Sequence, residues 1–142
     1  TLAMSSAASD VYKRQILGGK GQNTYEKLVN HLSEGFHVCL LADRHVGNSG
    51  VGVEFFNQMA AFPKGPIALS LQTQLPVIPA AFINIDNEYK LIFGKPFIVP
   101  HFENDAQSIQ HGLKVLSKEL EKLILLDPNQ WHSIQPVWTS EY

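Results

Sequence analysis

The chain has 142 residues, which is enough for one domain of ordinary size and too few for two. Its formal net charge is −2 and 17% of its residues are charged, which excludes both a nucleic-acid-binding polycation and an acidic tail. Hydrophobic residues make up 44% of the chain, so a packed globular core is expected.

Membrane and redox signals are few. The single cysteine, Cys39, can form neither an internal disulfide nor a zinc site by itself. No run of about 18 or more apolar residues occurs, so no transmembrane helix is predicted within the chain. Residues 1–10 lack the basic and apolar regions of a secretory signal.

Residues 1–15 are treated apart from the fold. Their string SSAASDVYKRQ resembles library adapter sequence that has been translated at the broken end of a metagenomic fragment. The alternative is a genuine, flexible N-terminal tail. On either interpretation the fold is expected within residues 16–142, and on the first one Thr1 is not a biological start.

The first half of the chain predicts a helix followed by two strands. The helix is expected from Asn23, which together with Glu26 resembles a capping box, to Gly35, and its apolar residues recur at helical spacing: Tyr25, Leu28, Val29 and Leu32. Residues 36–42, FHVCLLA, predict a strand buried on both faces. After a loop at 43–50, residues 51–56, VGVEFF, predict a second strand.

The second half predicts two helices around further strands. Pro66 suits the start of a helix that runs to about Gln74, and a strand follows within residues 76–85. Residues 89–94 and 95–99 are expected to supply a hairpin and an edge strand. The longest helix is predicted between Asp105 and Leu126, and a short turn of helix in the tail. The alternation of helices and strands predicts an α/β fold, with a mixed sheet flanked by helices.

The six histidines do not indicate a metal site. No two of them have the close helical spacing, with an intervening Glu, of a metalloprotease; they are His31, His37, His45, His101, His111 and His132. The sequence also lacks a Walker loop, a Gly-x-Ser-x-Gly elbow and a Gly-x-Gly-x-x-Gly fingerprint after a strand. We therefore predict no metal, and nucleotide binding has little support.

Three residues are candidates for chemistry. Asp43 and Arg44 follow a predicted strand, where open α/β sheets gather ligands, and an Arg there can bind a phosphate with two hydrogen bonds. Their alternative is a solvated ion pair. Glu54 shares a face of its strand with Gly52 and Phe56, and that face is either a cleft, in which a carboxylate can orient or protonate a substrate, or a solvent-facing surface.

Three strings together carry a family resemblance: LADRHVGNSGVGVEFF at 41–56, FPKGPIALSLQTQLPVIPAAF at 62–82 and DPNQWHSIQPVW at 127–138. In order and spacing they resemble the bacterial acyltransferases that acylate lipid A or phosphatidylinositol mannosides. The resemblance covers roughly residues 20–138 and about the C-terminal half of a full-length member, so the α/β domain would be incomplete. The Asp-Arg pair, the Gly-Pro-x-Ala-Leu helix start and the Trp-His pair resemble the mannoside branch more closely.

The resemblance implies a reaction and a missing base. Members of the family use a His, four intervening residues and an Asp, with the His as general base on the acceptor hydroxyl, and no such spacing occurs here. The chain alone is therefore expected to be nearly inactive. In the mannoside branch a carboxylate two residues before Glu54 assists catalysis; here Gly52 stands at that position, so either Glu54 substitutes for the carboxylate or the assisting acid is absent. The resemblance assigns Arg44 to the acceptor headgroup or phosphate, and Asp43 to holding Arg44 or the loop.

The resemblance also implies the partners. An acyl thioester, of coenzyme A or an acyl carrier protein, would be the donor, a membrane glycolipid the acceptor, and no cofactor or nucleic acid would be involved. The protein would be peripheral on the cytoplasmic face of the cell membrane. An acyl chain needs a long apolar groove, and four side chains are candidates for either its lining or ordinary core: Phe55, Phe56, Met59 and Phe62. The rival functions are a lipid A acyltransferase and a catalytically inactive lipid-binding domain.

Overall fold

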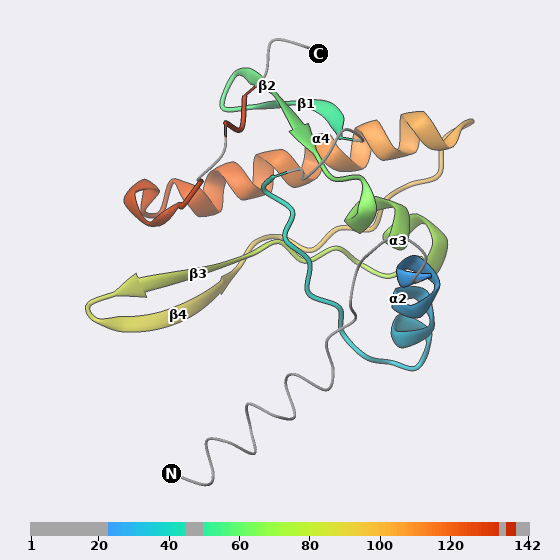
Figure 1. The fold of residues 1–142 in the computed structure, drawn as a ribbon, viewed down its shortest axis with the longest axis horizontal. Helices are drawn as coiled ribbons and strands as arrows, with labels where there is room; N and C mark the ends of the chain where they lie inside the picture. The colour runs from blue at the N-terminus through green and yellow to red at the C-terminus, as the bar shows by residue number, and fades with distance from the viewer. Residues whose placement is uncertain (1–22, 45–49, 134–135, 139–142) are drawn as a thin grey trace, which may run out of the picture. The chain divides into compact units, whose positions relative to one another are not determined.

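The computed structural model describes residues 23–44, 50–133 and 136–138. The chain divides into two compact units, residues 1–38 and residues 39–142. The segment predicted to derive from an adapter, residues 1–15, lies outside the described residues. The elements in chain order, shown in Figure 1, are α2 (Thr24–Ser33), β1 (Val51–Phe55), β2 (Gln58–Phe62), α3 (Gly65–Thr73), β3 (Ala80–Ile85), β4 (Glu88–Phe93), α4 (Asp105–Ile124) and the 3₁₀ turn η1 (Pro128–Gln130).

In the first unit, α2 has the predicted position but not the predicted cap. Asn23 precedes the helix with a left-handed backbone, φ 45°, and its side chain accepts no capping hydrogen bond. A capping side chain needs an extended backbone at that position, so the capping-box prediction is wrong. The helix ends as predicted before Gly35, whose φ of 85° suits glycine. No residue of α2 is buried.

Residues 36–42 do not form the predicted buried strand. Their backbone pairs with no strand among the residues that the structure describes, and Phe36 and Leu41 are 51% and 74% exposed. A strand is held in place by hydrogen bonds to a neighbouring strand. The apolar sequence indicates a tendency to be buried but cannot supply that neighbour.

In the second unit, the described strands form two separate antiparallel hairpins, β1–β2 and β3–β4. Helix α4 lies between the hairpins (Figure 1). Each hairpin has a two-residue turn in which both residues have positive φ: Phe56 and Asn57, and Asp86 and Asn87. Such turns match the natural twist of antiparallel strands. The predicted α/β class is confirmed.

The hairpins differ from the predictions in two details. Strand β2 was not predicted. The second hairpin turns at Asp86–Asn87, the residues that follow the strand predicted within 76–85. Both turn residues are of types that tolerate positive φ, which favours a turn there. Residues 95–99 contribute only an isolated bridge, Val77 to Phe97.

The helices of the second unit agree with the sequence pattern. Helix α3 has a proline in its first turn, as predicted. Helix α4 is capped by the Asn104 side chain, whose Oδ1 accepts the Gln107 N–H at 2.8 Å. The predicted short turn in the tail is η1, which begins at Pro128. None of the described helices combines the length and the apolar character needed to cross a bilayer.

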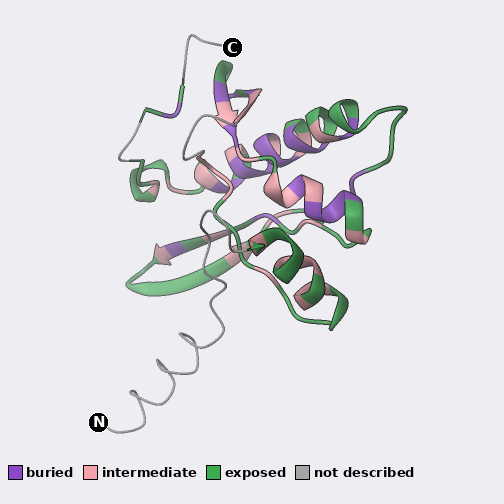
Figure 2. Cartoon of the chain, turned by 45° about the vertical axis from the view of Figure 1, so that its right-hand side comes forward, coloured by how far each residue is buried: buried purple, intermediate pink, exposed green. Residues whose placement is uncertain are grey.

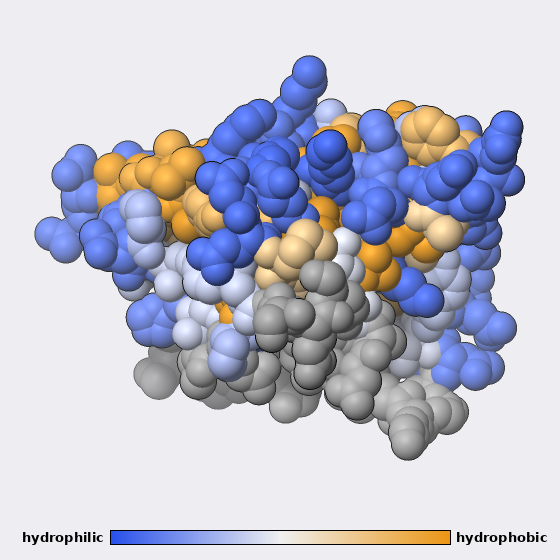
Figure 3. Space-filling model, turned by 90° about the horizontal axis from the view of Figure 1, so that it is seen from above, coloured by the Kyte–Doolittle hydropathy of each residue, from blue (hydrophilic) through white to orange (hydrophobic). Residues whose placement is uncertain are grey.

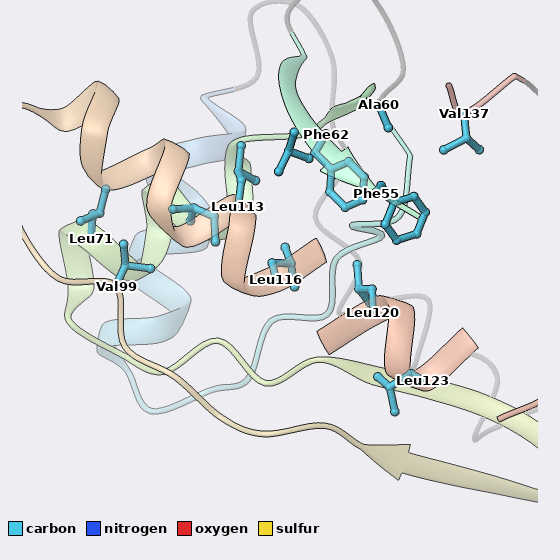
Figure 4. Packing of buried hydrophobic residues seen from close by; sticks show 12 residues of the cluster. Phe55, Ala60, Phe62, Leu71, Val99, Leu113, Leu116, Leu120, Leu123 and Val137 are labelled. Atoms are coloured by element: carbon cyan, nitrogen blue, oxygen red, sulfur yellow. The ribbon is translucent and has the colours of Figure 1, made fainter. Parts of the chain in front are cut away.

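The core lies along one face of α4. Leucines recur along that face at spacings of three and four residues and pack against β1, β2, α3 and the segment after β4 (Figure 4): Leu113, Leu116, Leu120 and Leu123. The facing side chains include Phe55 and Phe62, both fully buried. Full burial of each such side chain stabilises the fold by about 1.5–3 kcal/mol.

Hydrophobic side chains also remain at the surface. Seen from the side of β1 and β2, the molecule shows hydrophobic groups between hydrophilic ones (Figure 3). Seventeen large hydrophobic side chains of the described residues are exposed. The most exposed of those in strands lie on β3 and β4. Strand β4 is exposed along most of its length (Figure 2).

Gly112 of α4 is expected to tolerate no side chain. A Cβ atom there would lie 2.6 Å from Ile67 Cγ2 and 3.2 Å from Val99 Cγ1, both on fully buried residues. Gly112→Ala should therefore lower the free energy of unfolding by about 1–2 kcal/mol, because overpacking outweighs the helix propensity gained. Urea unfolding followed by circular dichroism measures this change.

The matched control is Gly65→Ala. No atom lies within 4 Å of the Cβ position at Gly65, so stability should change little. Ile67→Ala removes the clashing atoms. It should lower the free energy of unfolding less in the Gly112→Ala background than in the unmodified chain. Equal stability of the two glycine variants would contradict the close packing of α3 against α4.

Candidate functional site

Strand β1 carries Glu54 on its exposed face. Val53 and Phe55 point into the core, whereas Glu54 between them points outward, as the alternation of a strand requires. The Glu54 side chain is 57% exposed. In the part of the chain that the structure describes, this carboxylate therefore faces solvent.

Lys118 of α4 connects Glu54 to a second carboxylate. Its Nζ lies 3.2 Å from Glu54 Oε1, and 2.9 and 3.1 Å from the two oxygens of Glu121. Hydrogen bonds to Glu121, and then to Glu54, raise the pKa of the Lys118 ammonium above its usual value. We call Glu54, Lys118 and Glu121 the Lys118 cluster.

The cluster also fixes the turn that follows β1. Glu121 Oε1 accepts the backbone N–H of Phe56 at 2.7 Å. Nearer the start of α4, Gln110 Nε2 donates to the carbonyl of Gly52 at 3.0 Å. Side chains of α4 therefore hold β1 on both sides of Glu54, and they set where the Glu54 carboxylate stands relative to the helix.

Asp43 is held by a residue from the C-terminal tail. Its Oδ2 accepts the indole N–H of Trp131 at 3.0 Å. The Trp131 ring packs edge-on against Phe55, with centroids 5.7 Å apart, and against Trp138 at 6.1 Å. Trp138 in turn donates its indole N–H to the Phe55 carbonyl at 2.9 Å. Both tryptophans thus attach the tail to β1, and one of them orients Asp43.

Arg44 follows Asp43 directly and is half-buried. It forms an ion pair with no carboxylate among residues 23–44, 50–133 and 136–138, Asp43 included. The described partner of Asp43 is therefore the Trp131 indole rather than the guanidinium.

The predicted site residues do not converge on one point. Asp43 is hydrogen-bonded to Trp131, which packs against Phe55 on one face of β1. Glu54 projects from the other face of the strand. Of the proposed groove-lining residues, Phe55 and Phe62 are core side chains, Phe56 is half-buried beside Trp131, and Met59 is 37% exposed.

An open hollow lies on the outer side of α4. It has a volume of about 390 Å³, and His111, Lys114, Val115, Lys118 and Glu119 line it. The hollow is open to solvent, so it differs from the enclosed apolar groove that an acyl chain requires. In the part of the chain that the structure describes, no three His, Cys, Asp or Glu residues are grouped closely enough to hold a metal ion.

Glu119 gives the fold an expected dependence on pH. The Glu119 side chain is 12% exposed, and its carboxylate accepts hydrogen bonds from the Lys122 ammonium at 2.5 Å and from the Lys95 backbone N–H at 3.0 Å. These hydrogen bonds lower the pKa of Glu119. A lowered pKa means that Glu119 stabilises the fold fully above the ordinary Glu value of about 4.3, and that this contribution is lost as the pH falls through the folded-state pKa.

We therefore expect Glu119→Gln to flatten the pH dependence of stability on the acid side. The free energy of unfolding, measured by urea titration between about pH 5 and pH 2, should fall less steeply in the variant than in the unmodified chain. Glu103→Gln, at an exposed glutamate, is the control and should keep the original slope. Identical slopes for all three proteins would show that Glu119 contributes nothing to acid unfolding.

Lys118, Glu121 and Trp131 were not predicted from the sequence as site residues. Lys118 and Glu121 are three residues apart, which signals a helix-surface ion pair. Nothing in the sequence indicates that this pair meets Glu54, because 64 residues separate Glu54 from Lys118. The separation of Trp131 from Asp43 is 88 residues.

Comparison with known proteins identifies the family. The model of the bacterial lipid A biosynthesis acyltransferase family matches residues 13–140. Phosphatidylinositol mannoside acyltransferases of Mycolicibacterium smegmatis and Mycobacterium tuberculosis are 25% and 24% identical to the chain over 126 and 128 residues. These matches cover 88% of this chain, but only 40% and 38% of the relatives, so the chain spans about two fifths of their length. Because the family model matches nearly the whole chain, the chain belongs to the bacterial lipid A biosynthesis acyltransferase family.

Proposed function

We propose that residues 16–142 form the C-terminal part of an acyltransferase that moves a fatty acyl group from an acyl thioester to a sugar hydroxyl of a membrane glycolipid. The observation that carries this proposal is the family match over residues 13–140. The preferred acceptor is a phosphatidylinositol mannoside, because the relatives named above are phosphatidylinositol mannoside acyltransferases. The enzyme would act as a peripheral protein on the cytoplasmic face of the membrane.

The reaction requires a base that this chain does not hold in the family arrangement. The hydroxyl oxygen attacks the thioester carbonyl, an ester C–O bond forms, the C–S bond breaks, and the thiol of coenzyme A or of an acyl carrier protein leaves. The hydroxyl proton must pass to a base, which accelerates such steps by roughly 10²–10⁴. No histidine here is followed by Asp at the fifth position. The base would therefore belong to a part of the fold outside these residues.

Within the chain, we assign Glu54 to assisting the reaction, and Asp43 and Arg44 to the acceptor. The Glu54 carboxylate can accept a hydrogen bond from a sugar hydroxyl, and Lys118 would keep it in position on β1. Trp131 would keep Asp43 at the beginning of the loop, next to Arg44. The Arg44 guanidinium suits the phosphate of a glycolipid headgroup.

Replacing Arg44 with alanine in the complete enzyme is expected to raise the KM for the glycolipid acceptor by about 10-fold to 100-fold, because a charge-assisted pair contributes roughly 1.5–3 kcal/mol. The KM for the acyl thioester should stay the same. Arg44→Lys keeps the charge but cannot form the two parallel hydrogen bonds of a guanidinium. Its KM for the acceptor should lie between those of the unmodified enzyme and Arg44→Ala. Unchanged acceptor kinetics in Arg44→Ala would remove Arg44 from the site.

The function itself is tested with the complete reading frame. The source DNA upstream of the Gln15 codon is recovered, the whole protein is produced, and acyl transfer from a radiolabelled thioester is measured with phosphatidylinositol mannoside and with a lipid A precursor. Transfer to the mannoside supports the preferred acceptor. Transfer to the lipid A precursor alone would favour the rival function, a lipid A acyltransferase. The matched family model takes its name from that activity.

The inactive lipid-binding alternative rests on one specific observation. Gly52 occupies the position at which the resemblance implies a carboxylate, and the nearest acid, Glu54, already pairs with Lys118. In the same assay, this alternative predicts binding of glycolipid vesicles without turnover. Turnover that is lost in Glu54→Gln but retained in Glu103→Gln, a change at an exposed glutamate of the loop before α4, would exclude it.

A further inference from the structure

We propose that Gln130 is a positioning residue for the acceptor site. Its side-chain amide fixes the turn η1 to the edge of β3, and the fixed turn holds Trp131 where its indole N–H reaches Asp43. The inference rests on the proposed function, which assigns Asp43 and its neighbour Arg44 to the glycolipid acceptor. It deepens that function by naming a residue that acts on the acceptor site without touching the acceptor.

The side chain of Gln130 pairs with β3 as a neighbouring strand would. Its Oε1 accepts the backbone N–H of Asn84 at 2.7 Å, and its Nε2 donates to the Asn84 carbonyl at 2.8 Å. Two residues that lie opposite each other in a hydrogen-bonded pair of an antiparallel sheet exchange the same two bonds. Gln130 therefore takes the place of a strand at the outer edge of β3.

A third hydrogen bond joins the same amide to the start of η1. Gln130 Nε2 also donates to Asp127 Oδ2 at 2.7 Å, and Asp127 Oδ1 accepts the backbone N–H of Asn129 at 3.2 Å. The backbone N–H of Trp131 donates to the Pro128 carbonyl at 3.2 Å. The turn is thus closed by its own hydrogen bonds, so fixing Gln130 also fixes the backbone of Trp131.

Trp131 lies between two attachments of the tail. On one side Gln130 joins the turn to β3, and on the other side the Trp131 indole donates to Asp43 Oδ2 at 3.0 Å. Protection of a sheet edge would explain the two bonds to Asn84. It does not explain the bond to Asp127, which restricts the turn itself. The restricted turn determines where the indole N–H stands relative to Asp43.

The exposure of Gln130 makes the proposal testable without disturbing the core. The residue is exposed, so its hydrogen bonds compete with water and fixing its side chain costs conformational freedom. Three bonds that share one amide support each other, which favours the fixed arrangement. Because Gln130 fills no space in the core, replacing it should loosen η1 locally and leave the packing of α4 against the hairpins intact.

Hydrogen exchange of the indole protons tests the link in the 142-residue chain, which has two tryptophans. In ¹⁵N-labelled protein, Gln130→Ala should speed the exchange of the Trp131 indole N–H by about tenfold or more and leave that of Trp138 unchanged. Gln130→Glu keeps the length of the side chain but, as a carboxylate, has no N–H to donate, so it should behave like the alanine variant. The matched control, Asn104→Ala, loses one side-chain hydrogen bond at the start of α4 and should change neither indole.

Kinetics of the complete enzyme test the consequence for the acceptor. Gln130→Ala should raise the KM for the glycolipid acceptor by about threefold to tenfold and leave kcat and the KM for the acyl thioester unchanged. In a Trp131→Phe background the same change should raise the acceptor KM no further, because Gln130 acts through the indole.

Three results would overturn the proposal: an unchanged rate of exchange at the Trp131 indole, an unchanged acceptor KM, or a rise in acceptor KM that is equal in both backgrounds. A complete enzyme without acyl transfer would refute the proposed function and the acceptor role with it. The exchange rates need no acyl transfer, so they decide separately whether Gln130 holds Trp131.

Discussion

Replacing Phe55 with alanine is expected to lower the free energy of unfolding by about 3–5 kcal/mol, the largest effect of any single change considered for this chain. The side chain is fully buried and its ring contacts those of Phe56, Phe62 and Trp131. Alanine would lose this burial and leave a cavity between β1 and α4. Urea unfolding of residues 1–142, followed by circular dichroism, measures the loss.

Phe82→Ala is the matched control for Phe55→Ala. It makes the same substitution on the other hairpin, at a side chain that is 67% exposed, and should change the stability of residues 1–142 by less than about 1 kcal/mol. Comparable losses in the two variants would mean that the core does not lie where the structure places it.

Replacing Trp131 with alanine is expected to cost about 3 kcal/mol, and Trp131→Phe about 1 kcal/mol. Alanine removes the ring that joins Phe55 to Trp138, together with the hydrogen bond to Asp43. Phenylalanine keeps most of the ring contact and loses only the indole N–H. Chemical unfolding of the two variants beside the unmodified chain gives both values.

The same pair of variants separates packing from the orientation of Asp43. In the complete enzyme, Trp131→Phe should weaken acceptor binding, because the carboxylate beside Arg44 is no longer held. The matched change Trp138→Phe removes a hydrogen bond to the Phe55 carbonyl instead and should leave acceptor binding as it is. Identical acceptor kinetics in both phenylalanine variants would show that Trp131 only supports the core.

The helices could be predicted from the sequence because their signals are local. In α4, Leu113, Leu116 and Leu120 recur with the period of a helix, and the helix ends just before Asp127 and Pro128, as expected. In α3 a proline in the first turn marked the start. These features depend on residues within a few positions of each other, so no knowledge of the tertiary structure was needed.

The strands and the site depend on residues that are distant in sequence. Residues 36–42 have the composition of a buried strand but lack a described neighbour to pair with, and composition cannot reveal that. The turn before β2 begins at Phe56, an aromatic residue that is unusual at positive φ, so the hairpin gave no sequence signal. Glu54 was identified as a candidate, but its pairing with Lys118 depends on how β1 and α4 pack together.

The surroundings of β1 also determine when this part of the protein can finish folding during synthesis. Trp131 is made 88 residues after Asp43, and Glu121 is made 65 residues after Phe56. Ribosomes add roughly 5–20 residues per second, so Trp131 is synthesised roughly 4–18 s after Asp43. Strand β1 can pair with β2 soon after both are made, but its contacts with α4 and with the tail form only after residues 121–138 have been synthesised.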